Sequence, residues 1–265
     1  MLEIRDLHVQ FRDSDHEAVR GISMTVADGE IMGLVGESGS GKTVTAMMIS
    51  GLLSQEQVIT HGQILLDGED LLACDDERMR QKQGQDICVV FQEPMSAMDP
   101  TMRIGPQMEE SLKVHTKLSR EERRTRALEA LREVDLPNAE EIYGKYPHEL
   151  SGGMLQRVMI ASAILPNPRL LLADEPTTAL DVTIQAQILE LLKRLNREHG
   201  MSVLFISHNL NVVRKLCSRV AVMEKGHIVE DGETEQVFYR PQAPYTQRLI
   251  AAIPTRRKKD ARYSR

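Results

Sequence analysis

The amino-acid sequence predicts an α/β fold built around a parallel sheet. Two observations support this. The short apolar run EIMGLVG, residues 30–36, breaks into glycines and is followed by the helix-like KTVTAMMISGLL. Two further apolar runs, RLLLADEP and SVLFISH, flank the helix-like IQAQILELLKRLNREHG. A strand, a helix and a strand in this order indicate a parallel sheet.

The first third of the chain has the pattern of strands and turns. Residues 2–11 and 19–26 alternate partly between apolar and polar side chains, which favours strands. Residues 62–71, GQILLDGEDL, contain a further strand that ends at the turn-forming pair Asp67 and Gly68.

The middle of the chain, from about residue 95 to 166, is expected to form a helical subdomain. Within it, SREERRTRALEALREV opens with Ser119 and Glu122 at the spacing of a capping box. The same segment places Leu128, Leu131 and Val134 on one face, which is typical of an amphipathic helix.

The last third is expected to complete the sheet. Gly200 follows the helix-like segment and suits a helix C-cap. Residues 219–232, RVAVMEKGHIVEDG, have the pattern of a closing hairpin with Lys225 and Gly226 at its turn. We therefore expect one domain over residues 1–255.

Composition places the chain among ordinary globular proteins. Its 265 residues are 41% hydrophobic and 27% charged, and the formal net charge of −6 argues against a nucleic-acid partner. No apolar run approaches the ~20 residues of a membrane helix, and the acidic, alternating N-terminus is not a signal peptide. The basic tail RRKKDARYSR, residues 256–265, is either a solvated tail or a lipid contact.

The segment GESGSGKT, Gly36 to Thr43, fits the phosphate-loop pattern G-x-x-x-x-G-K-S/T. Its glycines let successive backbone N–H groups point at phosphate oxygens, and the following helix adds its positive end. Lys42 is expected to reach the β- and γ-phosphates, and the Thr43 hydroxyl to ligate Mg²⁺. The expected strand–loop–helix context favours nucleotide binding over a turn that binds nothing.

Polar side chains end the other apolar runs. Asp174 closes one predicted strand and suits a role in holding Mg²⁺, while Glu175 is expected to act on the water that attacks the γ-phosphate. His208 follows the next strand and is expected at the same sheet edge, as a sensor of the γ-phosphate. Gln92 also ends an apolar run, but alone it reads only as a surface amide.

The motifs together resemble one family over nearly the whole chain, the ATP-binding subunits of ABC transporters. In order, the chain has the phosphate loop, the glutamine Gln92, the signature LSGGM at 150–154, Asp174 and Glu175, ALD at 179–181, and the histidine His208. The resemblance implies an α/β ATP-binding core with an antiparallel β subdomain and an inserted helical subdomain. It also implies hydrolysis of ATP with Mg²⁺, catalysed by Glu175 and His208.

The resemblance further assigns the ligand-binding residues. It implies Mg²⁺ binding through Thr43, Gln92 and Asp174. The residues implied for ATP binding are Phe11, Gly36, Glu37, Ser38, Gly39, Ser40, Gly41, Lys42, Thr43 and Gln92. Phe11 is the candidate to stack on adenine. Alternatively, Phe11 is a strand residue that packs inward, or His16 contributes to adenine binding instead.

Two such subunits pack head-to-tail in the family, so that each ATP lies between one chain's phosphate loop and the other's signature segment. By this resemblance Ser151, Gly152 and Gly153 bind the partner's γ-phosphate. Met154 stands where the family usually has glutamine, and methionine cannot make the hydrogen bonds of that amide. The implied partners are a second ATP-binding subunit, identical or related, two membrane permease subunits and, indirectly, an extracytoplasmic solute-binding protein.

A narrower resemblance concerns the cargo. The segments VVFQEPMSAMDP and PYTQRLIAAIP are similar to the peptide and nickel importers, and SGGMLQR to the nickel members in particular. The expected function is an ATPase at the cytoplasmic face of the cell membrane that powers import of nickel, a nickel chelate or a short peptide.

Residues 93–108 are expected to meet the membrane subunits. The alternative is a soluble ABC-type ATPase in translation or DNA repair; a metabolite kinase would leave LSGGM and His208 without a role.

Overall fold

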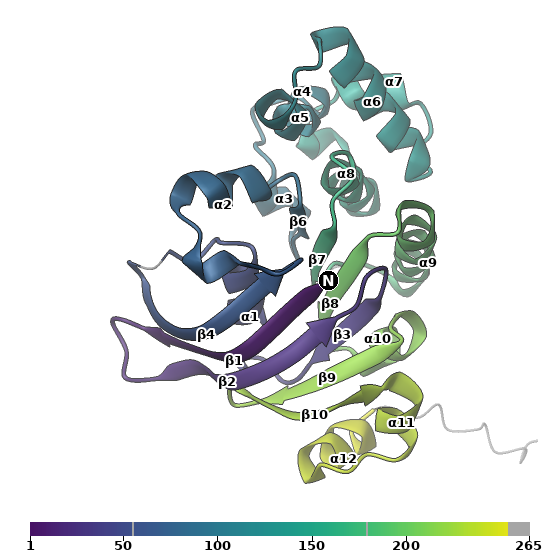
Figure 1. Ribbon diagram of the computed structural model, residues 1–265. Helices are drawn as coiled ribbons and strands as arrows, with labels where there is room; N and C mark the ends of the chain where they lie inside the picture. The colour runs from purple at the N-terminus through teal and green to yellow at the C-terminus, as the bar shows by residue number, and fades with distance from the viewer. Residues whose placement is uncertain (55, 179, 254–265) are drawn as a thin grey trace, which may run out of the picture.

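The computed structural model describes residues 1–54, 56–178 and 180–253, arranged as two sheets and their covering helices (Figure 1). Ala179 of the ALD motif and the basic tail, 256–265, lie outside the described residues. The first sheet is antiparallel, in the order β2-β1-β4-β5. Its strands are β1 (Leu2–Phe11), β2 (Glu17–Val26), β4 (Val58–Leu66) and β5 (Glu69–Asp70).

The second sheet is mostly parallel and has the order β10-β9-β3-β8-β7-β6. Strands β9, β3, β8, β7 and β6 run parallel, and only β10 at the edge is antiparallel. The strands are β3 (Ile31–Val35), β6 (Ile87–Val90), β7 (Leu170–Asp174), β8 (Ser202–Ser207), β9 (Arg219–Glu224) and β10 (His227–Glu233). The expected parallel sheet is confirmed.

Helices α3 to α8 follow one another between Pro94 and Ile164 and form the helical subdomain that projects from the sheet edge in Figure 1. The α-helices are α1 (Lys42–Ile49), α2 (Asp76–Lys82), α3 (Pro94–Ala97), α4 (Ile104–Met108), α5 (Glu110–His115), α6 (Arg120–Glu133), α7 (Ala139–Gly144), α8 (Gly152–Ile164), α9 (Val182–His199), α10 (Leu210–Leu216), α11 (Thr234–Tyr239) and α12 (Pro244–Ala251). Short 3₁₀ turns occupy Leu71–Ala73 and Pro147–Glu149. Among the described helices, none is long and apolar enough to cross a membrane.

Several local expectations are confirmed. The Ser119 hydroxyl accepts from the Glu122 backbone N–H while the Glu122 carboxylate accepts from the Ser119 N–H, which makes the capping box of α6. Gly200 ends α9 in the left-handed region, with φ of 66°. Lys225 and Gly226 form the β9–β10 turn with φ of 48° and 87°.

The core lies on both faces of the parallel sheet because its central strands are buried on both sides. In β7, Leu171 and Ala173 pack with helices α8 and α9, whereas Leu170 and Leu172 pack toward α1 and the antiparallel sheet. Continuous apolar runs are the sequence signature of such strands, since alternate residues reach opposite cores. The sheet is therefore a rigid support for the loops at its edge.

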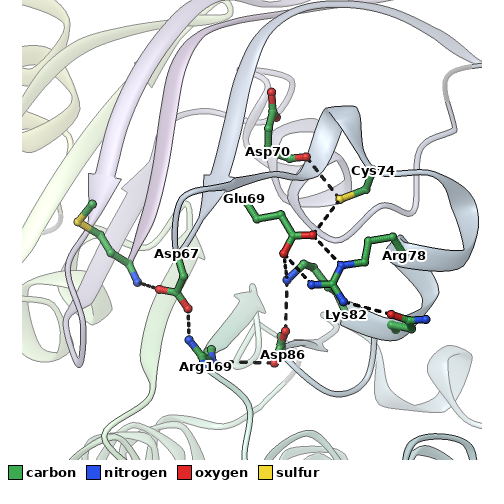
Figure 2. Close-up of polar contacts among 10 residues, drawn as sticks. Asp67, Glu69, Asp70, Cys74, Arg78, Lys82, Asp86 and Arg169 are labelled. Atoms are coloured by element: carbon green, nitrogen blue, oxygen red, sulfur yellow. Dashed lines mark hydrogen bonds and ion pairs between the residues drawn. The ribbon is translucent and has the colours of Figure 1, made fainter.

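A charged network ties the antiparallel sheet to α2 and to the start of β7 (Figure 2). The Arg78 guanidinium donates to both oxygens of Glu69 at 2.6 and 2.8 Å, and Lys82 lies 2.8 Å from the same carboxylate. Asp67 accepts from Arg169 and from the N-terminal amine of Met1. Asp67 and Arg169, which are 102 positions apart in the sequence, are thus joined at the start of β7.

Candidate functional site

The loop between β3 and α1 is compact because two glycines let other backbone meet it closely. A Cβ on Gly36 would lie 2.1 Å from the Met223 carbonyl oxygen. Gly41 has φ of 109°, and a Cβ there would lie 2.6 Å from the Ala18 carbonyl oxygen. Any side chain at either position would therefore distort the loop.

Lys42 lies folded into this loop. Its Nζ donates to the Gly36 carbonyl at 2.9 Å and to the Glu37 carbonyl at 2.7 Å, and the residue is only 5% exposed. Burial lowers the pKa of Lys42, while the charges of Glu175 and Asp174 oppose the shift. A partly desolvated cation at the start of a helix favours a polyanion such as a nucleotide phosphate chain.

The parallel sheet brings residues distant in the sequence to the same edge. Gln92 lies two residues beyond β6, Asp174 ends β7, and His208 follows β8. Because the carboxyl ends of parallel strands meet at one edge, these residues surround the phosphate loop that follows β3.

A cavity of about 720 Å³ opens at this edge. It is lined by His16, Ala18, Gly36, Glu37, Ser38, Gly39, Gly41, Lys42, Thr43, Val44, Gln92, Glu175, His208 and Leu249. Ser40 is buried beneath the loop, where its carbonyl accepts from the Gly226 N–H at 2.9 Å. The structure thus brings together most of the residues that the sequence nominated for ATP binding and catalysis.

Glu175 and His208 are in direct contact in this cavity. His208 Nδ1 lies 2.7 Å from Glu175 Oε1, and the Thr178 hydroxyl donates to Glu175 Oε2 at 2.9 Å. Glu175 has φ of 47°, an unusual backbone conformation for a residue with a side chain, and its N–H donates to the Ile206 carbonyl at 2.9 Å. Such strain is concentrated at functional sites, because the surrounding structure must maintain it.

Asp174 and Thr43 offer oxygen atoms that suit Mg²⁺. Burial raises the pKa of Asp174, a hydrogen bond from Thr43 lowers it, and the charge of Glu175 raises it further. Asp174 Oδ1 is buried and has no hydrogen-bond partner among the described residues. A buried carboxylate oxygen beside a hydroxyl fits Mg²⁺, which takes one or two protein oxygens and completes its shell with phosphates and water. These two residues fit the ion.

The signature residues do not line this cavity. Ser151 caps α8, with its hydroxyl accepting from the Met154 N–H at 3.3 Å, and Ser151 and Gly152 are exposed. A Cβ on Gly152 would meet nothing within 4 Å, whereas one on Gly153 would lie 2.9 Å from Ile184 Cγ2. Met154 packs against the core rather than facing the nucleotide cavity.

Phe11, the candidate for stacking on adenine, is also outside the cavity lining. It is partly buried and packs against the core beneath the antiparallel sheet. His16, the alternative considered from the sequence, lines the cavity together with Ala18. Leu249 of α12 was not anticipated at all, because no local motif marks a residue that reaches the site from the end of the chain.

The comparisons with known proteins agree with this geometry. The family model described as ABC transporter matches residues 19–178. A dimeric, post-hydrolysis structure of the ATP-binding cassette MJ0796 bound to ADP and Pi has a TM-score of 0.79 and 29% identity, and the match covers 88% of this chain and 99% of that one. CbiO1 from Clostridium perfringens, part of the ABC transporter complex CbiONQ, has a TM-score of 0.77 and 27% identity, with 90% of each chain covered.

Curated relatives match over more of the chain. The probable D,D-dipeptide transport ATP-binding protein DdpD of Escherichia coli is 48% identical, and the match covers 96% of this chain and 78% of DdpD. The oligopeptide transport ATP-binding protein OppD of Bacillus subtilis is 46% identical, over 96% of this chain and 72% of OppD. The phosphate loop, the strand-end residues and these matches agree, and the chain therefore belongs to the ATP-binding subunits of the ABC transporter family.

Proposed function

We propose that this protein is the ATPase subunit that energises import of short peptides through a membrane ABC transporter, at the cytoplasmic face of the membrane. The observation that carries the proposal is the cavity that joins the phosphate loop to Glu175 and His208. The cargo class is supported by the relatives, which are named for D,D-dipeptide and oligopeptide transport. These names lend no support to the nickel-type expectation, nor to a role in translation or DNA repair.

In this proposal the phosphate loop binds the triphosphate of ATP. Lys42 leaves the Gly36 and Glu37 carbonyls to contact phosphate oxygens, which replace the two hydrogen bonds that it makes here. Asp174 and Thr43, with Gln92 at the cavity wall, would hold Mg²⁺. The ion would neutralise charge that develops on the phosphates.

Glu175 would accept a proton from the attacking water. Its Oε1 is already oriented by His208 and its Oε2 by Thr178, so the carboxylate needs little reorganisation before it acts. His208 is the more exposed of the pair, with 53% of its side chain accessible against 15% for Glu175. That exposure suits contact with the γ-phosphate.

The signature residues would act on a second subunit's ATP. The open space in front of Gly152 and the free N-terminal end of α8 suit a phosphate presented by another molecule. The dimer of MJ0796 is a precedent for pairing of such cassettes.

Substitution Glu175→Gln tests the assignment of the catalytic base. The amide keeps the size of the side chain but takes up no proton, so we expect ATP binding to persist and hydrolysis to fall at least about 100-fold. Labelled-ATP binding and phosphate release would be measured on the same preparation. Unimpaired turnover in the variant would remove Glu175 from its role.

Uptake of a labelled dipeptide and of labelled nickel in cells that carry Glu175→Gln tests the cargo. Loss of dipeptide uptake alone is the expected result. Loss of nickel uptake alone would reassign the transporter to nickel, and unchanged uptake of both would leave the peptide proposal without support.

Residues 93–108 would contact a cytoplasmic helix of the permease subunits. Beside them, a cavity of about 420 Å³ between the sheet and the helical subdomain is lined partly by apolar side chains, among them Leu52, Phe91 and Met98. Phe91 and Met95 are 40% and 50% exposed, and together they present apolar surface that a permease helix would cover.

Two substitutions test this contact. We expect Glu93→Lys and Met95→Glu to impair assembly with the permease and cargo-stimulated ATPase activity, because the first reverses a charge and the second introduces one at the proposed interface. Ile59→Glu on β4, which is similarly exposed at 41%, is the control. Normal assembly of both test variants would refute the contact.

A further inference from the structure

The last described helix, α12, reaches the nucleotide site from outside the segment that the family model matches. That match ends at residue 178, whereas α12 covers Pro244–Ala251. In Figure 1, α12 lies beside β10, on the side of the molecule away from the helical subdomain. Its Leu249 nevertheless lines the nucleotide cavity.

One hydrogen bond connects α12 to the phosphate loop. The backbone N–H of Glu37 donates to the Tyr245 hydroxyl at 3.1 Å. The carbonyl of the same residue accepts from Lys42 Nζ at 2.7 Å. Both backbone groups of Glu37 are therefore held, one from within the loop and one from a helix about 200 residues later.

The Tyr245 side chain is held firmly in this position. The residue is only 6% exposed and belongs to the apolar core under the sheet. The Arg248 guanidinium lies 5.8 Å from the centroid of the Tyr245 ring and approaches Glu224 at 3.5 Å. The hydroxyl thus has little freedom to leave Glu37.

The start of α12 is anchored separately. The Glu230 carboxylate on β10 accepts from the N–H groups of Gln242 and Ala243 at 2.8 and 3.0 Å, just before the helix begins. Leu249 and Ile250 pack against the core at the other end of the helix. Anchored at both ends, α12 presents Tyr245 as a fixed hydrogen-bond acceptor.

We propose that Tyr245 is a positioning residue of the nucleotide site, whose hydroxyl holds the first turn of the phosphate loop in the geometry that binds ATP. The inference rests on the proposed binding of ATP in this cavity. Without the hydroxyl, the partly buried Glu37 N–H loses its partner, and loop conformations that hydrate it gain population. Because ATP binds only the competent conformation, its apparent affinity falls with that population.

The effect should appear in binding rather than in chemistry. Tyr245 does not line the nucleotide cavity, and no described hydrogen bond joins it to Glu175 or His208, although it lines the neighbouring cavity together with Glu37 and His208. Loss of a group that supports ground state and transition state equally raises KM and leaves kcat unchanged. A defect of folding alone would lower the amount of active protein, and hence apparent kcat, without changing KM.

The experiment is equilibrium dialysis of the full chain with radiolabelled ATP and Mg²⁺ at 4 °C, followed by steady-state hydrolysis with the partner subunits. We expect Tyr245→Phe to raise the Kd and KM for ATP about five- to tenfold with kcat unchanged. An unchanged Kd in Tyr245→Phe would overturn the inference.

Two controls separate the hydroxyl from packing. Tyr239→Phe makes the same chemical change on α11 at a residue that is 66% exposed. Thr246→Val removes another buried hydroxyl of α12, one without a described hydrogen-bond partner. Both should bind ATP as the wild type does; equal weakening by Thr246→Val and Tyr245→Phe would assign the effect to helix packing and refute the role of the hydroxyl.

A third variant, Lys42→Ala, distinguishes failure of the Tyr245 inference from failure of the proposed ATP binding. Lys42→Ala should abolish ATP binding. If Lys42→Ala bound ATP as tightly as the wild type, the phosphate-loop assignment itself would fail, and the inference with it. If only Lys42→Ala weakened binding, the site would stand and the role of Tyr245 would not.

Discussion

At the residue scale, the two glycines of the signature segment serve different purposes. Gly153 is required by the fold, because a Cβ there would lie 2.9 Å from Ile184 Cγ2. Gly152 has nothing within 4 Å of its added Cβ and is exposed. The packing of a single chain therefore explains the first glycine but not the second, which suits close approach of an external phosphate.

This difference predicts opposite outcomes for two alanine substitutions. Gly152→Ala should leave the free energy of unfolding unchanged within about 0.5 kcal/mol but lower ATPase activity of the assembled pair at least about tenfold, since the methyl group blocks a phosphate contact. Gly153→Ala should destabilise the chain by about 1–3 kcal/mol through overpacking. Urea unfolding and ATPase assays on both variants would decide; full activity of Gly152→Ala would contradict the assigned contact.

At the element scale, β5 and α2 are joined by one carboxylate. The hydrogen bond from Arg78, and after it that from Lys82, lowers the pKa of Glu69 from 4.5 to about 2 (Figure 2). A folded-state pKa below the unfolded value means that ionised Glu69 stabilises the fold above pH 4.5. The contribution is lost as pH falls from 4.5 toward 2.

We therefore expect Glu69→Gln to lower the urea midpoint at pH 7, and the difference from the wild type to shrink progressively below pH 4.5. The decrease in the urea midpoint should be modest, because the Glu69 side chain is 37% exposed and water screens its ion pairs. Glu190→Gln removes the same charge from a residue that is 75% exposed on α9, and it should change the midpoint little at either pH. A pH-independent difference for Glu69→Gln would contradict the assignment.

At the scale of the whole molecule, the nucleotide cavity and the signature segment of one chain are separate. None of Ser151, Gly152 or Gly153 lines the cavity that holds Lys42 and Glu175. If the signature binds nucleotide, it must bind that of another molecule, so ATP would join two subunits.

Light scattering on Glu175→Gln with ATP and Mg²⁺ tests this pairing. A doubling of mass on addition of ATP is expected if the partner is an identical copy, and it should disappear in Lys42→Ala. If the partner is a related chain, the mass should rise only when that chain is added. Failure of ATP to promote association with either partner would contradict the head-to-tail arrangement.

The sequence by itself determined the fold class, the parallel sheet and most of the cavity lining. Phosphate-loop residues are contiguous, so one local pattern identifies Gly36 to Thr43. The positions of Glu175 and His208 beside the phosphate loop were also predictable, although these residues are far apart in the sequence. Parallel strands place their carboxyl ends at one edge, so knowing where each strand ends was enough to bring these residues together.

Only the tertiary structure decided the contacts between segments that no local pattern links. It placed His16 rather than Phe11 in the cavity lining, because the course of the β1–β2 connection is not encoded in residue spacing. It also brought Tyr245 to Glu37, a contact across 208 positions. Such a hydrogen bond depends on how α12 docks against β10, and docking results from packing of the whole core rather than from the periodicity of any one element.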